Sequence, residues 1–492
     1  MALPAALYSA AQVRALDAYA IEHLGVPGYT LMKRAGEAAL RFLRMRFPTS
    51  HRIVIVCGGG NNGGDGYVLA RFAQAAGLTV TVLATVPPES LRGDAGRAYE
   101  DLIASEVQVR PFAPQHFTEG EVIVDALLGT GLHSTVRADA AEVIRAINAA
   151  SRPIFALDIP SGLDSNSGAV LGAAVRADST VTFVALKTGL FVGEGPEHTG
   201  ALFFDDLAVP VPATAEFAPR LERIIETEIR KALPRRARDA NKGDFGRVLI
   251  VGGSPGMAGA ARLAGEACLR VGAGLVTVAV APENVAAIVA GMPELICWGL
   301  GQAQDLSPLI ERAQVIAIGP GLGRSDWALR VLRQVLETEK PLVVDADALN
   351  LIAQHGAQPR DGWILTPHPG EAARLLSVST EEIQRDRLAA LDRLLERYGG
   401  TVVLKGAGTL VGTRGQTPGI CELGNPGMAS AGMGDVLTGT IAGFLAQCRD
   451  RALSARAGVL AHAMAGDAAA RGGERGLLAG DVARELRGCV NL

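Results

Sequence analysis

Short apolar runs alternate with longer stretches in which alanine and leucine recur at helical spacing, and this alternation continues through most of the chain. Short apolar runs bounded by glycine, proline or aspartate are typical of buried strands. The strands expected on this basis are 52–57, 79–85, 121–126, 152–160 and 179–186, followed by 247–253, 274–281, 314–320, 341–347, 363–367 and 401–406. Strands that alternate with helices indicate parallel sheets covered by helices, so the pattern predicts an α/β fold.

The strand pattern stops between residues 212 and 232, in a stretch that carries several prolines and leads into the basic cluster Arg235–Arg238. Proline and charge without apolar periodicity are typical of a connector. Both halves of the chain open with a strand and a glycine-rich turn, but their later landmarks differ. We therefore expect two unrelated domains rather than a repeat: residues 1–215, a linker over 216–232, and residues 233–492.

Composition narrows the class of protein without identifying it. The 492 residues are 48% hydrophobic and carry a net charge of −4 with no basic patch, which disfavours nucleic acid and anionic membranes as partners. No apolar run is long enough to span a bilayer, and residues 1–25 are typical of an amphipathic helix rather than a signal peptide. The six cysteines are scattered, and Cys57 and Cys268 lie in apolar runs, which predicts buried thiols. We expect a cytoplasmic protein.

The stretch GGGNNGGDG, residues 58–66, has the G-x-G-x-x-G spacing of a dinucleotide-binding turn at Gly58, Gly60 and Gly63. That fingerprint requires an acidic residue about 20 positions later for the ribose hydroxyl, but the first acid after Asp65 is Glu89, beyond the next strand. No Lys-Ser/Thr pair follows, so a P-loop is also excluded. The glycines still suit a phosphate at a helix N-terminus, while the neighbouring asparagines and aspartate add side-chain oxygens.

Two further loops carry oxygen-bearing side chains at strand ends. Asp125 precedes a Gly129–Gly131 turn, and Asp158 and Ser161 follow the next strand. The carboxyl ends of parallel strands line one crevice, so Asn62, Asp125 and Ser161 could converge as ligands of Na⁺ or K⁺; without histidine or cysteine, zinc is disfavoured. Asp158 would then be a candidate acid or base. The alternative is that these aspartates only cap the turns that follow them.

The motifs GGGNNGGDGYVLAR, VDALLGTGL and DIPSGLDS resemble the epimerase domain of the NAD(P)H-hydrate repair family, over about residues 10–210. The resemblance implies a Rossmann-like three-layer domain that interconverts the R and S forms of hydrated NADH or NADPH. It implies that K⁺ is held by Asn62, Asp125 and Ser161, and that Asp158 contacts the substrate at the reacting carbon. The implied substrate-binding residues are Asn61, Asn62, Gly63, Gly64, Asp65, Gly129, Thr130, Gly131, Leu132, His133, Ser134, Thr135 and Asp158.

In the second half, the small-residue stretch NPGMASAGMGD ends at Gly432-Met433-Gly434-Asp435, and a helix is expected from about Val436. Such a turn directs backbone N–H groups and the helix dipole at one point, which suits an anion. Asp435 at its mouth could take the proton from a hydroxyl that attacks a phosphoryl group. The alternative is an ordinary aspartate N-cap.

Other strand ends in this half carry polar groups. Asp345 and Asp347 end one strand, and TPHPGE places His368 and Glu371 at a strand-to-helix turn. Lys405 follows another strand and could bind the phosphates of a nucleotide. His368 could equally be a structural loop histidine, and Lys405 a solvated lysine at a strand end.

Together with NKGDFG, the motifs TPHPGE and NPGMASAGMGD resemble the ribokinase-like fold and, more narrowly, the ADP- or ATP-dependent NAD(P)H-hydrate dehydratase, over about residues 225–490. The resemblance implies phosphorylation of the ring hydroxyl by ADP or ATP with Mg²⁺, then loss of phosphate, with Asp435 activating the hydroxyl. The hydrated nicotinamide would be contacted by Ala260, Gly321, His368 and Asp435. The nucleotide would be held by Lys405, Gly406, Ala407, Gly408, Thr409 and Gly434.

Two other functions compete with a bifunctional repair enzyme. One is a vitamin or sugar kinase fused to a nucleotide-sensing domain, against which the TPHPGE loop argues. The other is a first domain that only binds protein or RNA, against which the intact Asn62, Asp125, Asp158 and Ser161 and the acidic balance argue. The expected partners are small molecules, and we expect a homo-oligomer.

Overall fold

The computed structural model describes residues 3–105, 107–301 and 306–492, which divide into two compact units, Met1–Leu221 and Glu222–Leu492. The region predicted as a linker contains a short strand, β10 (Leu221–Arg223), and a short helix, α7 (Thr227–Ala232). Among the described residues, no helix is both long and apolar enough to cross a bilayer.

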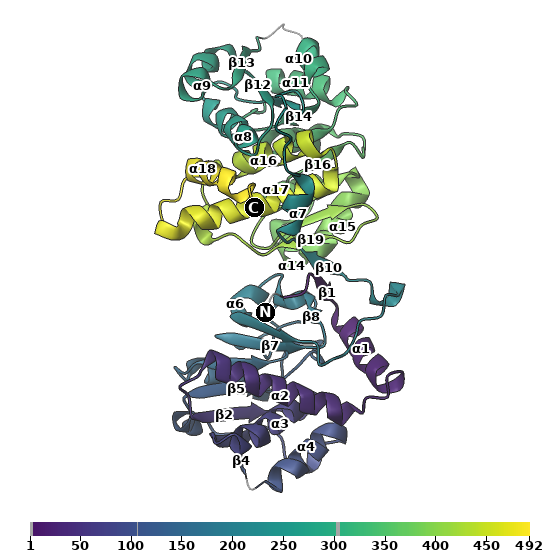
Figure 1. Ribbon diagram of the computed structural model, residues 1–492, viewed down its shortest axis with the longest axis vertical. Coiled ribbons are helices and arrows are strands. Elements are labelled where there is room, and N and C mark those ends of the chain that lie inside the picture. Colours follow the sequence, from purple (N-terminus) through teal and green to yellow (C-terminus); the bar gives the residue numbers. More distant parts are fainter. Residues whose placement is uncertain (1–2, 106, 302–305) are drawn as a thin grey trace. The chain divides into compact units, whose positions relative to one another are not determined.

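In the first unit, a parallel sheet has the strand order β4-β3-β2-β5-β6-β7-β9 (Figure 1). Because β2 has β3 on one side and β5 on the other, the chain reverses direction across the sheet at β2. The carboxyl ends at such a switch point form the usual ligand crevice of a doubly wound fold. The strands are β2 (Arg52–Cys57), β3 (Thr79–Ala84), β4 (Gln108–Pro111), β5 (Val122–Ala126), β6 (Ile154–Leu157), β7 (Ser179–Phe183) and β9 (Ala201–Asp205).

Both faces of this sheet are covered, which confirms the three-layer prediction. Ile53 and Ile55 of β2 pack into the core formed with the first helices, whereas Val54 and Val56 pack into a second core with α5. Alternate residues of a strand point to opposite faces, so an uninterrupted apolar run satisfies both cores. The α-helices are α1 (Ala10–Glu22), α2 (Gly28–Arg46), α3 (Asn61–Ala75), α4 (Gly93–Ile103), α5 (Ala138–Ala149) and α6 (Gly195–Thr199).

Two details at the start of the chain differ from the prediction. The helix expected over residues 1–25 is confined to α1, and it is preceded by the strand β1 (Ala6–Tyr8). β1 pairs in parallel with β8 (Leu186–Lys187), with Tyr8 opposite Lys187. Ser9 then begins α1 through a capping box with Gln12. The first strand therefore anchors α1 beside Lys187.

The second unit contains a larger sheet in the order β13-β12-β11-β14-β15-β16-β17-β18-β19-β10. The strands from β13 to β17 are parallel, whereas β18 is antiparallel to both of its neighbours. The strands after β10 are β11 (Arg247–Val251), β12 (Leu275–Val280), β13 (Ile296–Gly299), β14 (Val315–Ile318), β15 (Leu342–Val344), β16 (Trp363–Leu365), β17 (Thr401–Leu404), β18 (Thr409–Thr413) and β19 (Gly419–Cys421).

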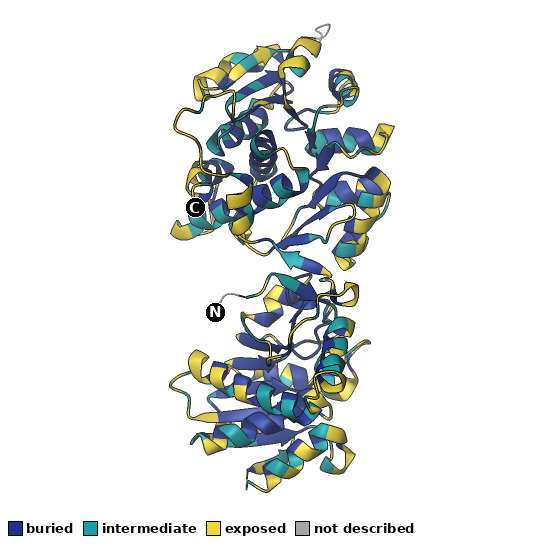
Figure 2. Cartoon of the chain, turned by 45° about the vertical axis from the view of Figure 1, so that its right-hand side comes forward, coloured by how far each residue is buried: buried dark blue, intermediate teal, exposed yellow. Residues whose placement is uncertain are grey.

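Helices α8, α16, α17 and α18 pack against one another and form the main core of this unit with the sheet (Figures 1 and 2). The middle of α16 is buried on all sides, which explains why its sequence is rich in small and apolar residues. The helices after α7 are α8 (Ala258–Arg270), α9 (Val285–Gly291), α10 (Ser307–Arg312), α11 (Asp326–Leu336), α12 (Ala346–His355), α13 (Pro369–Leu376), α14 (Thr380–Arg385), α15 (Arg387–Tyr398), α16 (Met433–Cys448), α17 (Arg451–Ala469) and α18 (Ala479–Cys489).

Candidate active sites

In the first unit, the glycine-rich stretch is a loop only as far as Gly60, because α3 begins at Asn61. Asn61 to Asp65 therefore form the first turn of a helix rather than the predicted loop. A Cβ at Gly63 would lie 2.0 Å from the carbonyl oxygen of Gly58. Only glycine permits this approach, which folds the turn back onto the end of β2.

Asp125 and Ser161 join the ends of β5 and β6. The Ser161 hydroxyl donates to Asp125 Oδ1 at 2.6 Å, and the Ser161 backbone N–H donates to Asp125 Oδ2 at 2.8 Å. Both side chains are fully buried. Burial raises the pKa of Asp125 to about 6, although the hydrogen bonds from Ser161 lower it.

Asn62 completes this group through Leu128. The Asn62 amide donates to the Leu128 carbonyl at 2.8 Å, and the Leu128 N–H donates to Ser161 Oγ at 2.8 Å. Asn62 Oδ1 is buried and accepts no hydrogen bond within the described residues. A buried acceptor of this kind costs about 1–3 kcal/mol when nothing satisfies it. The structure thus brings the three predicted cation ligands together and leaves one oxygen available.

Asp158 lies at the end of β6 with a left-handed backbone, φ 64°. Its carboxylate pairs with the ammonium group of Lys187, which is 1% exposed. Lys187 Nζ also donates to Thr182 Oγ1 at 2.9 Å and to the Phe183 carbonyl at 2.7 Å. Sequence reasoning missed Lys187, although a lysine inside the apolar run VTFVALKTGLFV is a signal, because buried lysines require partners.

Sequence reasoning also missed Asp17 as a residue of this site. Asp17 is half-buried on α1. Burial raises its pKa to about 6, with Lys187 lowering it and Asp158 raising it. Burial, Asp158 and Asp17 likewise raise the pKa of Asp65. The charge of Lys187 therefore acts on three carboxyl groups, of which that of Asp158 is in contact with it.

The predicted substrate loop between β5 and α5 lies at the surface. Gly129, Thr130 and Leu132 are partly buried, whereas Gly131 and His133 to Thr135 are exposed. Arg14 of α1 donates to the Thr130 carbonyl at 3.2 Å. This contact holds α1 against one side of the loop, and the exposed residues of the loop face solvent.

The second unit gathers its polar groups at the carboxyl ends of β15 and β17. Lys405 Nζ donates to Asp345 Oδ1 at 2.6 Å, and the Thr438 hydroxyl of α16 donates to Asp345 Oδ2 at 2.7 Å. Lys405 also lies 3.7 Å from Glu371 Oε2. Burial lowers the pKa of Lys405, but Asp345 and Glu371 outweigh it, so the pKa is raised and the ammonium form is favoured.

Asp435 lies in the first turn of α16, because that helix begins at Met433 rather than near Val436 as predicted. Gly432 precedes the helix with φ 89°, a conformation that glycine adopts without strain. Burial and the neighbouring Asp345 raise the pKa of Asp435 to about 7, while Lys405 lowers it. An acid with such a pKa can exchange a proton near neutrality.

His368 caps α13, so part of its role is structural. Its Nδ1 accepts from the N–H groups of Gly370 at 3.0 Å and Glu371 at 3.4 Å, and Glu371 accepts from the His368 N–H at 2.8 Å. Burial and the charge of Lys405 lower the pKa of His368. The ring is half exposed, which leaves its outer face available to a substrate.

Ala260 and Gly321, the other predicted substrate residues, come from α8 and from the loop after β14. A Cβ at Gly321 would lie 3.0 Å from the Ala260 Cβ, so the two backbones are in close contact. Gly321 has φ 59°, and its carbonyl accepts from the Ser254 N–H at 2.7 Å. The structure therefore places these two residues side by side.

The predicted nucleotide loop, Lys405–Thr409, is held by a residue that sequence reasoning missed. The buried Arg387 donates to the carbonyls of Leu404, Lys405 and Gly408 at 3.1, 3.3 and 3.2 Å. Burial lowers its pKa to about 10, which still leaves the guanidinium charged near neutrality. No local motif indicates this role of Arg387, because the carbonyls that accept its hydrogen bonds lie 17 to 21 residues away in the sequence.

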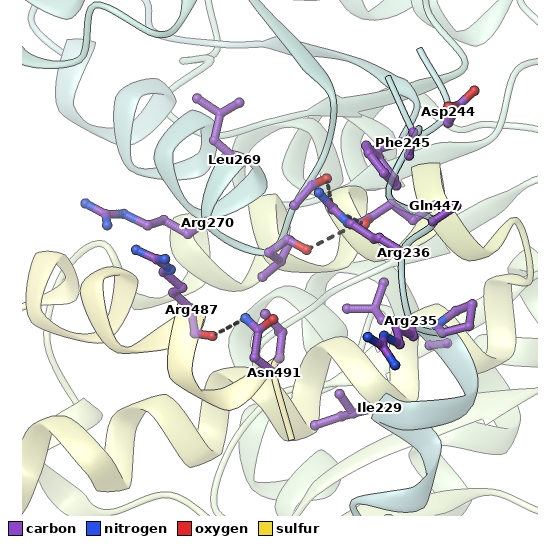
Figure 3. Close-up of a pocket in the computed structure, with 18 of the residues that line it drawn as sticks. Ile229, Arg235, Arg236, Asp244, Phe245, Leu269, Arg270, Gln447, Arg487 and Asn491 are labelled. Carbon is purple, nitrogen blue, oxygen red and sulfur yellow. Dashed lines mark hydrogen bonds between the residues drawn. The ribbon is translucent and has the colours of Figure 1, made fainter. Parts of the chain in front are cut away.

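A cavity of about 1560 Å³ opens at the amino end of β11 (Figure 3). Its wall includes Asn241, Asp244 and Phe245, with the Arg236 guanidinium 3.6 Å from the centre of the Phe245 ring. The predicted substrate and nucleotide residues are absent from its described lining. The NKGDFG motif thus lies at the opposite end of its strand from Asp345 and Asp435.

Comparisons with known proteins account for both units. A family model described as YjeF-related protein N-terminus matches residues 28–189, and one described as NAD(P)H-hydrate dehydratase matches residues 248–487. A protein of Coxiella burnetii called bifunctional NAD(P)H-hydrate repair enzyme Nnr is 50% identical over 488 residues, covering 99% of both chains. An Escherichia coli protein with the same name is 43% identical over 100% of this chain and 95% of its own.

Solved structures resemble the second unit. An ADP/ATP-dependent NAD(P)H-hydrate dehydratase from Bacillus subtilis, co-crystallised with ATP and Mg²⁺, is 31% identical with a TM-score of 0.50, covering 54% of this chain and 96% of its own. A ribokinase-like superfamily protein from Enterococcus faecalis is 32% identical with a TM-score of 0.52, covering 55% of this chain and 95% of its own. The ribokinase-like fold predicted for the second half is confirmed.

Proposed function

We propose, from the premise that this chain belongs to the bifunctional NAD(P)H-hydrate repair enzymes, that its two reactions use separate sites around Asp158 and Asp435. The chain is an NAD(P)H-hydrate epimerase in its Rossmann-like first unit and an ADP- or ATP-dependent dehydratase in its second. A vitamin or sugar kinase fused to a sensor is not favoured, because the named relatives match both ends of the chain.

The first unit suits K⁺ as its resident cation. Asn62 Oδ1 is a buried oxygen without a hydrogen bond among the described residues, and Asp125 and Ser161 add two oxygens beside it. Oxygen donors with a single carboxylate fit a weakly held monovalent cation better than zinc. When bound, K⁺ would supply a fixed positive charge next to the negatively charged nucleotide. Asn61 to Asp65 and Gly129 to Thr135 would line the substrate.

Asp158 would contact the substrate at the reacting carbon. Its carboxylate is held by the buried Lys187, so it cannot rotate freely away from the crevice. A positioned charge of this kind stabilises positive charge that develops on a substrate during reaction. The left-handed backbone of Asp158 supports a role in substrate contact, because strained conformations concentrate at functional sites.

In the second unit, Asp435 would accept the proton of the substrate hydroxyl as that hydroxyl attacks the terminal phosphate of ADP or ATP. Phosphate is a better leaving group than water, so the phosphorylated hydrate would collapse to the dihydronicotinamide. The amides at the start of α16 and the Lys405–Thr409 loop would stabilise the transferring phosphate, and Ala260, Gly321 and His368 would hold the hydrate. Asp345 and Asp347 raise the pKa of Asp435, and this carboxylate repulsion fits a Mg²⁺ ion that would neutralise the phosphates.

The observation that carries the proposal is that each unit gathers its own ionisable groups at the carboxyl ends of its parallel strands, with a partly buried carboxylate among them, Asp158 in the first unit and Asp435 in the second. The test uses the full chain with two variants. Asp435→Asn should stop dehydration and leave exchange between R and S hydrates intact. Asp158→Ala should stop exchange and leave dehydration of the S form intact. If either substitution abolished both reactions, the two-site assignment would be wrong. That the enzyme is a homo-oligomer in the cytoplasm stays a prediction.

A further inference from the structure

Helix α1 begins before the segment that the family model matches, residues 28–189, yet it lies against the epimerase site. Three contacts hold it there. Tyr8 of β1 pairs with Lys187, the Thr188 hydroxyl donates to the Tyr8 carbonyl at 2.9 Å, and the Ala10 N–H donates to Asn166 Oδ1 at 2.9 Å. The start of α1 is therefore fixed beside the lysine that binds Asp158.

Asp17 lies on the partly buried side of α1, close enough to that lysine for its charge to act on the Asp17 carboxyl group. Arg14 reaches the Thr130 carbonyl, and Asp17 lies three residues later on the same side of the helix. Val13, Leu16 and Ala20 are buried around Asp17. An aspartate among buried neighbours needs a structural or functional explanation, because aspartate is rarely buried without a partner.

We infer that Asp17 is the proton-donating acid of the epimerase and that Lys187 is the positioning residue that keeps Asp158 as its ionised counterpart. This inference rests on the proposed role of Asp158. Two carboxyl groups near one ammonium group divide into an ionised and a protonated member when their surroundings differ. Lys187 donates to Asp158, whereas Asp17 has no hydrogen bond from Lys187 among the described residues. The charged groups that face Asp17 are Arg14 on its own helix and Asp65, Asp158 and Lys187 on neighbouring elements.

The two roles complete a balanced reaction. The reacting carbon of the hydrate carries the ring nitrogen and the hydroxyl. Asp17 would give its proton to that hydroxyl, the carbon–oxygen bond would break, and water would leave as the nitrogen lone pair formed a carbon–nitrogen double bond. The resulting cation would lie beside the Asp158 carboxylate. Water would then add to the opposite face and lose one proton to solvent, and solvent would return a proton to Asp17, so no external reagent is consumed.

The test measures the exchange of separated R and S hydrates by the full-length enzyme without ADP or ATP, after subtraction of the uncatalysed rate. Asp17→Asn should lower kcat for exchange by about 100-fold or more, the usual contribution of a general acid. Because the acid must be protonated, the wild-type rate should fall as the pH rises through about 6, and Asp17→Asn should lose this dependence. Asp17→Glu should restore part of it. Glu22→Gln, at an exposed position on the same helix, is the matched control.

Lys187 is tested by two variants. Lys187→Met should lower kcat more than it raises KM and should change the pH profile, whereas Lys187→Arg should recover part of the rate. Circular dichroism and thermal unfolding of each variant establish that it folds. Wild-type kcat and pH dependence in folded Asp17→Asn would overturn the role of Asp17. An inactive Asp158→Ala beside an unaffected Asp17→Asn would reject this inference alone, whereas an active Asp158→Ala would reject the proposed epimerase site itself.

Discussion

Lys405 and Asp345 form a buried ion pair with 2.6 Å between Nζ and Oδ1, and Asp345 is only 2% exposed at its side chain. The pair joins the carboxyl ends of two strands that are separated by β16. It also places a positive charge beside Glu371 and Asp435. Lys405 is therefore the cation that contacts the carboxylates of this group directly.

Replacing that cation should destabilise the second unit. Lys405→Met leaves Asp345 buried without its partner, and breaking a buried pair in this way costs about 3–5 kcal/mol. Urea unfolding of the variant should show this loss, together with a raised KM for ADP or ATP. The exposed Lys231→Met should leave both values within error of the wild type. Equal stability of the two variants would show that the ion pair contributes little.

The pH dependence of dehydration should reflect Asp435. A base acts only when deprotonated, so the rate should rise with pH through about 7, the raised pKa of this group. Asp435→Asn should lower kcat by about 100-fold or more and remove the rise. Initial rates with pure S hydrate across the pH range provide the measurement. A rise with pH through about 7 that persists in Asp435→Asn would assign the titration to another residue.

Arg387 should affect nucleotide binding indirectly, because it fixes the backbone of the Lys405–Thr409 loop. Arg387→Ala removes three donated hydrogen bonds from the carbonyls around Lys405–Thr409. We expect KM for ADP or ATP to rise about tenfold, equivalent to about 1.4 kcal/mol, while KM for the hydrate changes less. The exposed Arg393→Ala is the control. An unchanged nucleotide KM would separate this loop from nucleotide binding.

Removing the side-chain oxygen of Asn62 should weaken the binding of K⁺ to the first unit. Asn62→Ala removes the buried Oδ1 oxygen that no described residue satisfies. The K⁺ concentration for half-maximal epimer exchange should rise by about tenfold or more, whereas Asn62→Asp, which keeps an oxygen at this position, should retain a response. Exchange rates measured against K⁺ at constant ionic strength test this. A wild-type enzyme that is indifferent to K⁺ would contradict the proposal.

Glycine at position 63 should be required for the stability of the first unit as well as for the geometry of the epimerase site. Its Cβ would lie 2.0 Å from a carbonyl oxygen, so Gly63→Ala should cost about 1–3 kcal/mol through overpacking. The nearby Gly60, the N-cap of α3, has open space around a Cβ and φ −100°, so Gly60→Ala should lose only the preference of a cap for glycine over alanine, roughly 0.5 kcal/mol. Thermal unfolding of the two variants side by side distinguishes them. Equal midpoints would contradict the close approach.

The sequence predicted what depends on local pattern. Buried central strands such as Ile154–Leu157 are continuous apolar runs. The rule that parallel strands end at one edge placed Asn62 near Asp125 and Ser161. Short edge strands were missed: Gln108–Pro111 is only partly buried and carries no apolar run. Strand identity there follows from pairing with a neighbour rather than from composition.

The residues that sequence reasoning missed share a different cause. Lys187, Asp17 and Arg387 act through partners that are distant in sequence or supplied by backbone carbonyls. No spacing rule connects α1 with a lysine about 170 residues later. Tertiary packing decides which charged side chain on a helix faces a site, and hydrophobic periodicity shows only that one face is buried.

One chain should repair both forms of the hydrate. The most direct test supplies the purified enzyme with a mixture of R and S hydrates, K⁺, Mg²⁺ and either ADP or ATP, and follows the near-ultraviolet absorbance of reduced nicotinamide. We predict complete recovery with at least one nucleotide, recovery that stops once the S form is consumed in Asp158→Ala, and none without nucleotide. No recovery with either ADP or ATP would show that this chain does not repair the hydrate.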